Sequence, residues 1–304
     1  MLQALAHYRE FAPCEALRGH VRAFFSFTTP AENPSACRLI TRDVRFGAGD
    51  PFCSPVFADG HVSIVFSFGS AYRTDGLWHS ITAAPRADVI GPMSVVGPAS
   101  GGERQDMVGA YFHAAQAPLV THIPVSELTD RVLSLDDVWG SAGSDLVTRL
   151  GEANNEAARI DRLESALLQW RAKERSPRAA LDLPGLAGFV IRRHGRLTVQ
   201  CLANAAGVSR QHLTRVFRET VGVTPKLFCR LARFQAALWC AGRGKSVDWA
   251  QAAVEMGYSD QSHMIAEFRQ FSSLTPTALA LQRWFHPFIE RARDSIFPIA
   301  RSLR

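Results

Sequence analysis

The sequence predicts an α+β protein: a β-rich N-terminal domain, sandwich-like or barrel-like, followed by helices and then an all-α C-terminal domain. Three observations predict this class. Apolar alternation and frequent Gly and Pro mark the first 115 residues, helical spacing begins near residue 116, and a two-helix pattern occurs twice near the C-terminus. A chain of 304 residues can hold two domains with separate cores. The expected divisions are 1–174 for the β-rich domain and its helical tail, 175–185 for a linker, 186–285 for the all-α domain and 286–304 for a tail.

Two apolar runs support the β-rich half. Residues 61–68 alternate strictly, so a strand there would place one apolar set on a single face: Val62, Ile64, Phe66 and Phe68. Residues 21–27 form a second run, rich in aromatic side chains. Gly and Pro at short intervals between residues 47 and 102 are typical of turns between short strands.

Helical signals dominate the rest of the chain. Residues 157–173 carry apolar side chains on one helical face, which would pack either against their own domain or against a second copy of the chain. Further on, polar residues stand where helix N-caps are needed, which predicts seven helices in about 100 residues. The expected N-caps are Thr198, Ser209, Thr224, Ser246 and Thr275.

The two-helix pattern combines small residues, a Gly turn, a second helix ending in Phe, and Thr-Pro. The first copy contains Leu202-Ala203, Gly207, Leu213, Phe217 and Thr224-Pro225, and the second contains Ala252-Ala253, Gly257, Met264, Phe268 and Thr275-Pro276. Small residues let two helices cross closely, and glycine tolerates the positive φ of a tight turn. This geometry is a helix-turn-helix, which places its second helix in the DNA major groove.

The outer face of each second helix carries the candidate DNA contacts. They are Arg210, Gln211, His212, Thr214, Arg215 and Arg218 in the first copy, and Gln261, Ser262, His263, Ile265, Ala266 and Arg269 in the second. Arg recognises guanine, Gln pairs with adenine, and the Thr methyl contacts thymine, whereas residues at the edge of the stripe favour phosphates. The second stripe is poorer in hydrogen-bonding groups, so we expect the first copy to supply most base discrimination.

Charge and composition narrow the function classes. Residues 186–285 hold 13 Lys and Arg against five Asp and Glu, a net charge of +8, which leaves −2 for the remainder of the chain. Such a concentration of basic charge favours a polyanionic partner. No apolar run is long enough for a membrane span and no signal peptide is evident, so we expect a cytoplasmic protein without a membrane partner. The six cysteines lack Cys-x-x-Cys spacing and are expected to be buried free thiols.

The residues of the repeated pattern resemble the AraC/XylS family of bacterial transcription regulators. Residues 197–217 resemble its first helix-turn-helix unit, and residues 257–268 with Thr275-Pro276 resemble its second. The resemblance implies two units joined by a long helix, with base contacts from Gln211, Thr214 and Arg215 and from Gln261, Ser262, Ile265 and Ala266. Ala266 stands where many members have Arg, and Ser273 where most have Gly.

The N-terminal half resembles the β-rich sensor or dimerisation domain of one subgroup, at residues 8–13, 58–61 and 128–131. The resulting hypothesis is a sequence-specific transcriptional regulator that is not an enzyme. Its expected partners are promoter DNA, a small effector, a second copy of the chain and RNA polymerase, and no cofactor is expected. Two alternatives stay open: an N-terminal domain that only dimerises, and a metal-dependent enzyme fused to the DNA-binding domain. The metal ligands in that last case would be His61, His79, His113 and His122 with Asp59.

Overall fold

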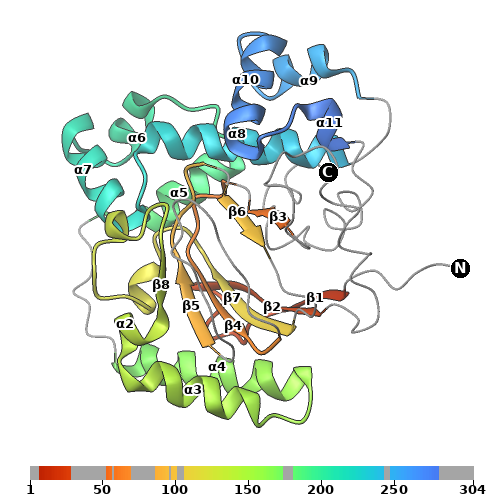
Figure 1. Cartoon of the computed structure of the whole chain (residues 1–304). Helices are drawn as coiled ribbons and strands as arrows, with labels where there is room; N and C mark the ends of the chain where they lie inside the picture. The colour runs from red at the N-terminus through yellow and green to blue at the C-terminus, as the bar shows by residue number, and fades with distance from the viewer. Residues whose placement is uncertain are drawn as a thin grey trace, which may run out of the picture.

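A computed structural model of the protein describes residues 7–28, 53–56, 58–69, 86–95, 97–100, 106–173, 181–242 and 247–280 (Figure 1). Within these ranges the N-terminal half holds strands β1 (His7–Phe11), β2 (Val21–Thr28), β3 (Cys53–Val56), β4 (Ser63–Ser67), β5 (Arg86–Ile90), β6 (Gly97–Ser100), β7 (Asp106–Phe112) and β8 (Val132–Ser134). Two 3₁₀ turns, η1 (Ala117–Leu119) and η2 (Val125–Glu127), precede helices α2 (Leu135–Trp139), α3 (Ser141–Gly151) and α4 (Glu156–Lys173). The C-terminal half holds α5 (Leu183–Arg192), α6 (Val199–Ala205), α7 (Arg210–Val221), α8 (Pro225–Gly242), α9 (Trp249–Glu255), α10 (Gln261–Ser272) and α11 (Pro276–Ala280). The predicted α+β class is confirmed.

The strands form a six-stranded antiparallel sheet and a separate two-stranded pair. The order in the larger sheet is β1-β2-β7-β4-β5-β8, and β3 pairs with β6. Helices α3 and α4 cover one face of the sheet, and the β3–β6 pair lies on the side away from them (Figure 1). Strand β4 is shorter than the predicted run, and all five of its residues are buried. Its residues are buried because β4 lies in the middle of the sheet, between β7 and β5, with both faces covered.

Helix α4 packs against its own domain, one of the two arrangements that its apolar face allowed. Ile160, Leu163 and Leu167 are buried in the same cluster as the sheet residues Phe24 and Phe66. Near the end of the helix, the ring of Trp170 stacks on Trp139 with centroids 4.4 Å apart. The apolar face of α4 is therefore used to close the core of the N-terminal domain.

Seven helices, α5–α11, make up the described part of the C-terminal domain, as the sequence predicts. Four expected N-caps are confirmed by side-chain oxygens that accept backbone N–H groups: Thr198 from Cys201 at 3.1 Å, Ser209 from His212 at 3.2 Å, Thr224 from Leu227 at 3.2 Å and Thr275 from Ala278 at 3.2 Å. The fifth is corrected. Helix α9 is capped by Asp248, whose carboxylate accepts from Ala250 and Gln251, and residue 246 lies outside the described residues.

The last residues of the predicted linker belong to a helix. Asp182 accepts the backbone N–H of Gly185 at 2.9 Å and caps α5, so residues 183–185 are helical. The two prolines led to the longer linker, although a proline in the first turn of a helix sacrifices no hydrogen bond. Among the thiols predicted to be buried, Cys229 is buried, Cys14 is half-buried and Cys201 is exposed, and all three are free.

The two domains share a packed contact. Helix α8 contacts residues 58–61, which precede β4, and α7 contacts the turns η1 and η2, which follow β7. Gln235 donates to the carbonyl of Asp59 at 3.0 Å, the rings of His61 and Phe228 meet edge to face at 6.3 Å, and Thr129 donates to the carbonyl of Gly222 at 2.7 Å. The all-α half is thus held against the β-rich half through α8.

Candidate nucleic-acid interface

Helices α6 and α7 form one helix-turn-helix, α9 and α10 form the second, and α8 joins them (Figure 1). Gly207 (φ +66°) and Gly257 (φ +78°) make the two turns in the left-handed region, as predicted. Ala203 and Ala253 are fully buried where the paired helices cross. Helix α8 has 18 residues, which at about 1.5 Å per residue makes a connection about 27 Å long. Two recognition helices are therefore carried on one continuous strut.

The structure explains why the repeat spacing changes within the pattern. The turns are 50 residues apart, whereas the recognition helices begin 51 residues apart, at Arg210 and Gln261. The additional residue is Asp260, which takes over the N-cap of α10 and accepts the N–H of His263 at 2.8 Å. In the first unit Ser209 performs this role directly after the turn.

Helix α7 presents its predicted polar stripe to solvent. Leu213 and Phe217 are fully buried on the inner side of the helix. The outward residues Arg210, Gln211, His212, Arg215 and Arg218 are exposed, and Thr214 is half-buried, with its hydroxyl donating to the carbonyl of Arg210 at 2.7 Å. The sequence therefore assigned the two sides of this helix correctly, while contact with DNA stays a prediction.

Arg215 forms an exposed ion pair with Glu219. Its guanidinium is 3.1 Å from the Glu219 carboxylate, with 60% of the Arg215 side chain exposed. An exposed i,i+4 ion pair contributes only about 0.3–0.5 kcal/mol, whereas a good bidentate contact with a base is worth about 1–3 kcal/mol. The pair with Glu219 is therefore weak enough for a base contact to replace it.

Helix α10 presents a less polar outer face. Gln261, Ser262, Ala266 and Arg269 are exposed and Ile265 is half-buried, while Met264 and Phe268 are fully buried. His263, also predicted as a contact, has its ring held on the α8 side of the helix. One ring nitrogen lies 3.1 Å from the Ser259 hydroxyl and the other 3.6 Å from the Glu267 carboxylate. The side chain keeps 40% of its surface exposed.

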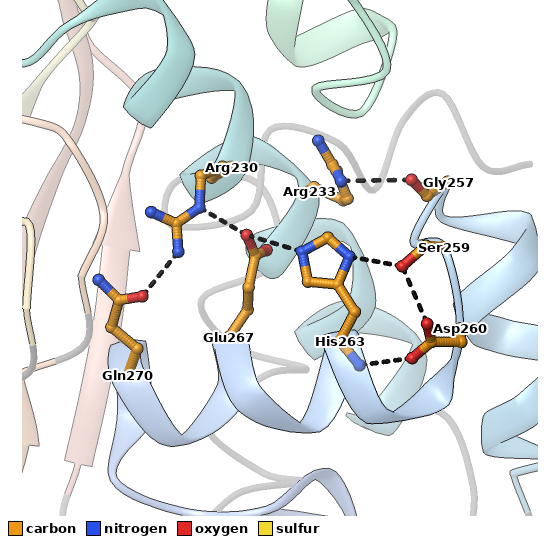
Figure 2. Close-up of polar contacts among 8 residues, drawn as sticks. All are labelled: Arg230, Arg233, Gly257, Ser259, Asp260, His263, Glu267 and Gln270. Atoms are coloured by element: carbon orange, nitrogen blue, oxygen red, sulfur yellow. Dashed lines mark hydrogen bonds and ion pairs between the residues drawn. The ribbon is translucent and has the colours of Figure 1, made fainter.

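Sequence reasoning missed the ionic link between α8 and α10, which Figure 2 shows. Arg230 of α8 donates to Glu267 at 2.6 Å and to Gln270 at 2.6 Å, and Glu267 is almost fully buried. Arg233 donates to the carbonyl of Gly257, at the turn of the second unit, at 3.2 Å (Figure 2). These contacts fix the second unit on the strut.

The signal for this link was present in the repeat. At an offset of 51 residues, Glu267 occupies the place of Val216 in the first unit. A carboxylate at an inner helical position is costly to bury unless a cation pairs with it, so the substitution pointed to a basic partner on a neighbouring helix. Next to it, burial and then the Glu267 charge raise the pKa of Tyr258 well above its ordinary value, so that phenol stays neutral.

A groove of about 640 Å³ lies between the two units. It is lined by Leu197, Thr198, Val199, Lys226, Cys229, Arg230, Arg233, His263, Ala266, Glu267 and Gln270. Lys226, Arg230 and Arg233 follow one face of α8 at helical spacing, and Lys226 is exposed. Three cationic side chains therefore line the α8 wall of the groove, where Arg230 pairs with Glu267 and Arg233 donates to the carbonyl of Gly257.

The metal ligands considered for an enzymatic alternative do not form a metal-binding group in the described residues. Across the described ranges, no group of three or more His, Cys, Asp or Glu side chains could hold a metal ion. Of the candidate ligands, His79 lies outside those ranges. A search of the same residues finds no helix with the length and apolarity required to cross a membrane.

Two helix-turn-helix units on a shared strut define the class of the C-terminal domain. Residues 202–282 match the family model described as a helix-turn-helix domain. These residues form a helix-turn-helix domain of the AraC type, as the repeated motifs indicated. Residues 9–134 match a second model, described as a domain of unknown function (DUF6597). No curated protein matches the chain.

Crystal structures of ToxT from Vibrio cholerae are similar to the chain at low identity. One, from strain O395, shares 11% identity over 75% of this chain and 92% of that one, with a TM-score of 0.42. A structure at 1.65 Å resolution shares 10% over 76% and 97%, with a TM-score of 0.45. A third, of wild-type ToxT from strain SCE256 bound to unsaturated fatty acid, shares 14% over 75% and 89%, with a TM-score of 0.42.

Proposed function

We propose that this protein is a sequence-specific DNA-binding transcriptional regulator, and that its N-terminal domain receives a small effector. The observation that carries the first part is the exposed stripe on α7. Gln211 and Arg215 are exposed one helical turn apart on the solvent side of a capped helix whose inner side is fully buried. Base-reading residues of helix-turn-helix proteins lie near the start of the second helix, where both of these residues stand.

The second unit supplies affinity more than discrimination in this proposal. Ser262 and Ala266 occupy the positions of Gln211 and Arg215, so fewer side chains can distinguish one base pair from another. Lys226 and Arg269 are exposed cations that would contact phosphates, which adds affinity on any sequence. Major grooves one turn apart, about 34 Å, would be reached from the two ends of a 27 Å strut with modest DNA bending.

The packed contact between the domains supports the regulatory part. Because α8 carries both recognition units and also touches the chain at residues 58–61, a ligand that moves this segment would change how the units are presented. Dimerisation of the N-terminal domain and contact with RNA polymerase are further parts of the proposal, carried over from the family resemblance.

The test compares Arg215→Ala with Arg192→Ala in equilibrium DNA binding. Arg192 is exposed on α5 and carries the same charge, but it lies outside the recognition helices. On a selected binding site, Arg215→Ala should lose about 1–3 kcal/mol, with the loss confined to one base-pair position. Arg192→Ala should weaken all sequences alike or leave them unchanged. Equal losses for Arg215→Ala on the selected site and on scrambled DNA would contradict base reading by this residue.

A further inference from the structure

Arg22 is a buried cation whose hydrogen-bond donors have no acceptor. It lies on β2 at an irregularity in the pairing with β7, between Val21 and Ala23. The three guanidinium nitrogens are buried and make no hydrogen bond within the part of the chain that the structure describes. The group lies over the ring of Tyr111, 5.5 Å from its centroid. Guanidinium carries five N–H donors and stays charged, so its burial without an acceptor is unfavourable, and an anion that accepts these hydrogen bonds would remove the cost.

Two histidines beside Arg22 also present unused polar atoms. The Nδ1 atoms of His20 and His61 are buried and without a hydrogen bond in the described residues. Burial, followed by the charge of Arg22, lowers the pKa of His61 well below its ordinary value and that of His113 to about 4. The imidazoles of His61 and His113 are therefore neutral at pH 7, and Arg22 is the fixed positive charge beside them.

The nearest acidic groups are already engaged elsewhere. The Asp59 carboxylate accepts the backbone N–H of His61 at 3.1 Å, and burial raises its pKa to about 6. Glu10 accepts the hydroxyl of Tyr8 at 2.6 Å. Neither carboxylate comes within 4.0 Å of the Arg22 nitrogens to form an ion pair. Both act on Arg22 only at longer range, so its N–H groups stay available.

Aromatic rings form an apolar surface next to the guanidinium. Phe25 stacks on Tyr111 with centroids 4.6 Å apart, and Tyr8 stacks on Phe25 at 6.2 Å. Gly109 makes this arrangement possible, because a Cβ there would lie 2.5 Å from the Phe25 ring. A planar carboxylate matches the guanidinium fork with two parallel hydrogen bonds, and an apolar group attached to it would match the rings.

We propose that Arg22 receives the carboxylate of a small organic acid whose apolar part lies along the Tyr111 and Phe25 rings. A carboxylic acid would then be the chemical class of the effector. The binding site itself does not depend on the proposed function, whereas the effect of binding on DNA recognition does. Residues 58–61 link the site to the strut, since Gly60 packs on Phe228 and Leu231 and the carbonyl of Asp59 accepts from Gln235. Carboxylate binding would therefore act on the element that carries both recognition units.

The experiment is thermal denaturation of the full chain with benzoate and hexanoate as probes, at constant ionic strength. Benzamide and hexanamide serve as neutral counterparts, and inorganic phosphate serves as a different anion. At least one carboxylate should raise the melting temperature in a saturable way while its amide does not, because a ligand of the native state stabilises it by mass action. Arg22→Gln should weaken the apparent affinity at least about tenfold, the equivalent of losing charge-assisted hydrogen bonds.

The matched control is Arg159→Gln. Arg159 is likewise a largely buried arginine over an aromatic ring, 4.3 Å from the Phe68 centroid, but its charge is satisfied by Asp106 at 2.7 Å. This variant should lower stability without changing carboxylate affinity. The comparison of carboxylate with amide on the wild-type chain needs no variant, so it stands even if Arg22→Gln fails to fold.

Several results would overturn the proposal: stabilisation by the amides equal to that by the acids, stabilisation by phosphate alone, unchanged affinity in Arg22→Gln, or no stabilisation by either carboxylate. DNA affinity measured with and without the bound carboxylate separates the remaining parts. Binding of the acid by a chain that does not bind DNA would leave the site standing and remove the regulator function. Binding with unchanged DNA affinity would contradict the link through residues 58–61.

Discussion

Gly222→Ala should destabilise the protein and loosen α7 from the N-terminal domain. Gly222 caps α7 at φ +92°, and a Cβ there would lie 2.7 Å from Pro92 Cγ and 3.0 Å from the Thr129 hydroxyl. Left-handed backbone costs a non-glycine residue about 1–2 kcal/mol, and overpacking of a tight contact adds about 1–3 kcal/mol. The sum, about 2–5 kcal/mol, exceeds the effect of most surface substitutions. The clash also falls where Thr129 donates to the Gly222 carbonyl.

Ser273→Gly is the matched opposite change. Ser273 lies 51 residues after Gly222, caps α10 at φ +60°, and is exposed. Relief of about 1–2 kcal/mol of left-handed strain outweighs the roughly 0.4–1 kcal/mol that glycine loses through unfolded-chain entropy, so this variant should be slightly more stable. Urea denaturation followed by tryptophan fluorescence measures both changes. A neutral Gly222→Ala, or a Ser273→Gly as destabilising as Gly222→Ala, would refute the assignment of these caps.

Three further changes test the site and its supports. Glu267→Gln should lower stability by about 1–2 kcal/mol in thermal denaturation, because it removes the charge that pairs with Arg230 at a buried position. Unchanged stability would show that this ion pair between α8 and α10 does not stabilise the fold. Burial raises the pKa of Asp59 to about 6, so the wild-type protein should lose stability as pH rises from about 4 to 6 and this carboxyl ionises. Asp59→Asn has no charge to bury, so its stability relative to the wild-type chain should rise over the same pH range and stay higher above it. Parallel stability curves for the two proteins across this range would contradict the raised pKa. Ser209→Ala should cost about 1 kcal/mol by removing the cap of α7, and its failure to do so in urea denaturation would mean that solvent replaces the cap.

The C-terminal domain was predictable from sequence because its signals are local. Gly207 and Gly257 mark positive-φ turns, Ser209 caps the helix that follows it, and Leu213 and Phe217 identify the inner face of α7. Each of these rules acts within four residues along the chain. The outward stripe followed from the same periodicity, so the exposure of Gln211 and Arg215 required no knowledge of the tertiary structure.

Features that depend on distant residues were not predictable in the same way. The alternation of residues 61–68 indicated one apolar face for β4 but not that its other face would also be covered, because that depends on strand order. The contact of Thr129 with Gly222 joins residues 93 positions apart. In the sequence, Arg22 resembles any polar residue of a half-exposed strand. The pairing of β2 with β7 is what places it beside Tyr111. Burial of a charged side chain depends on the tertiary structure, so the sequence alone could not predict it.

Selection of bound sequences from random double-stranded DNA tests whether α7 and α10 read adjacent major grooves from one strut. If they do, the enriched site should hold two segments whose centres are about 10–10.5 base pairs apart. One segment should be strongly specified, and it should lose one base preference in Arg215→Ala; the other should be weakly specified. Recovery of unenriched DNA, or of a site whose preferences are the same in Arg215→Ala, would contradict base reading by these helices.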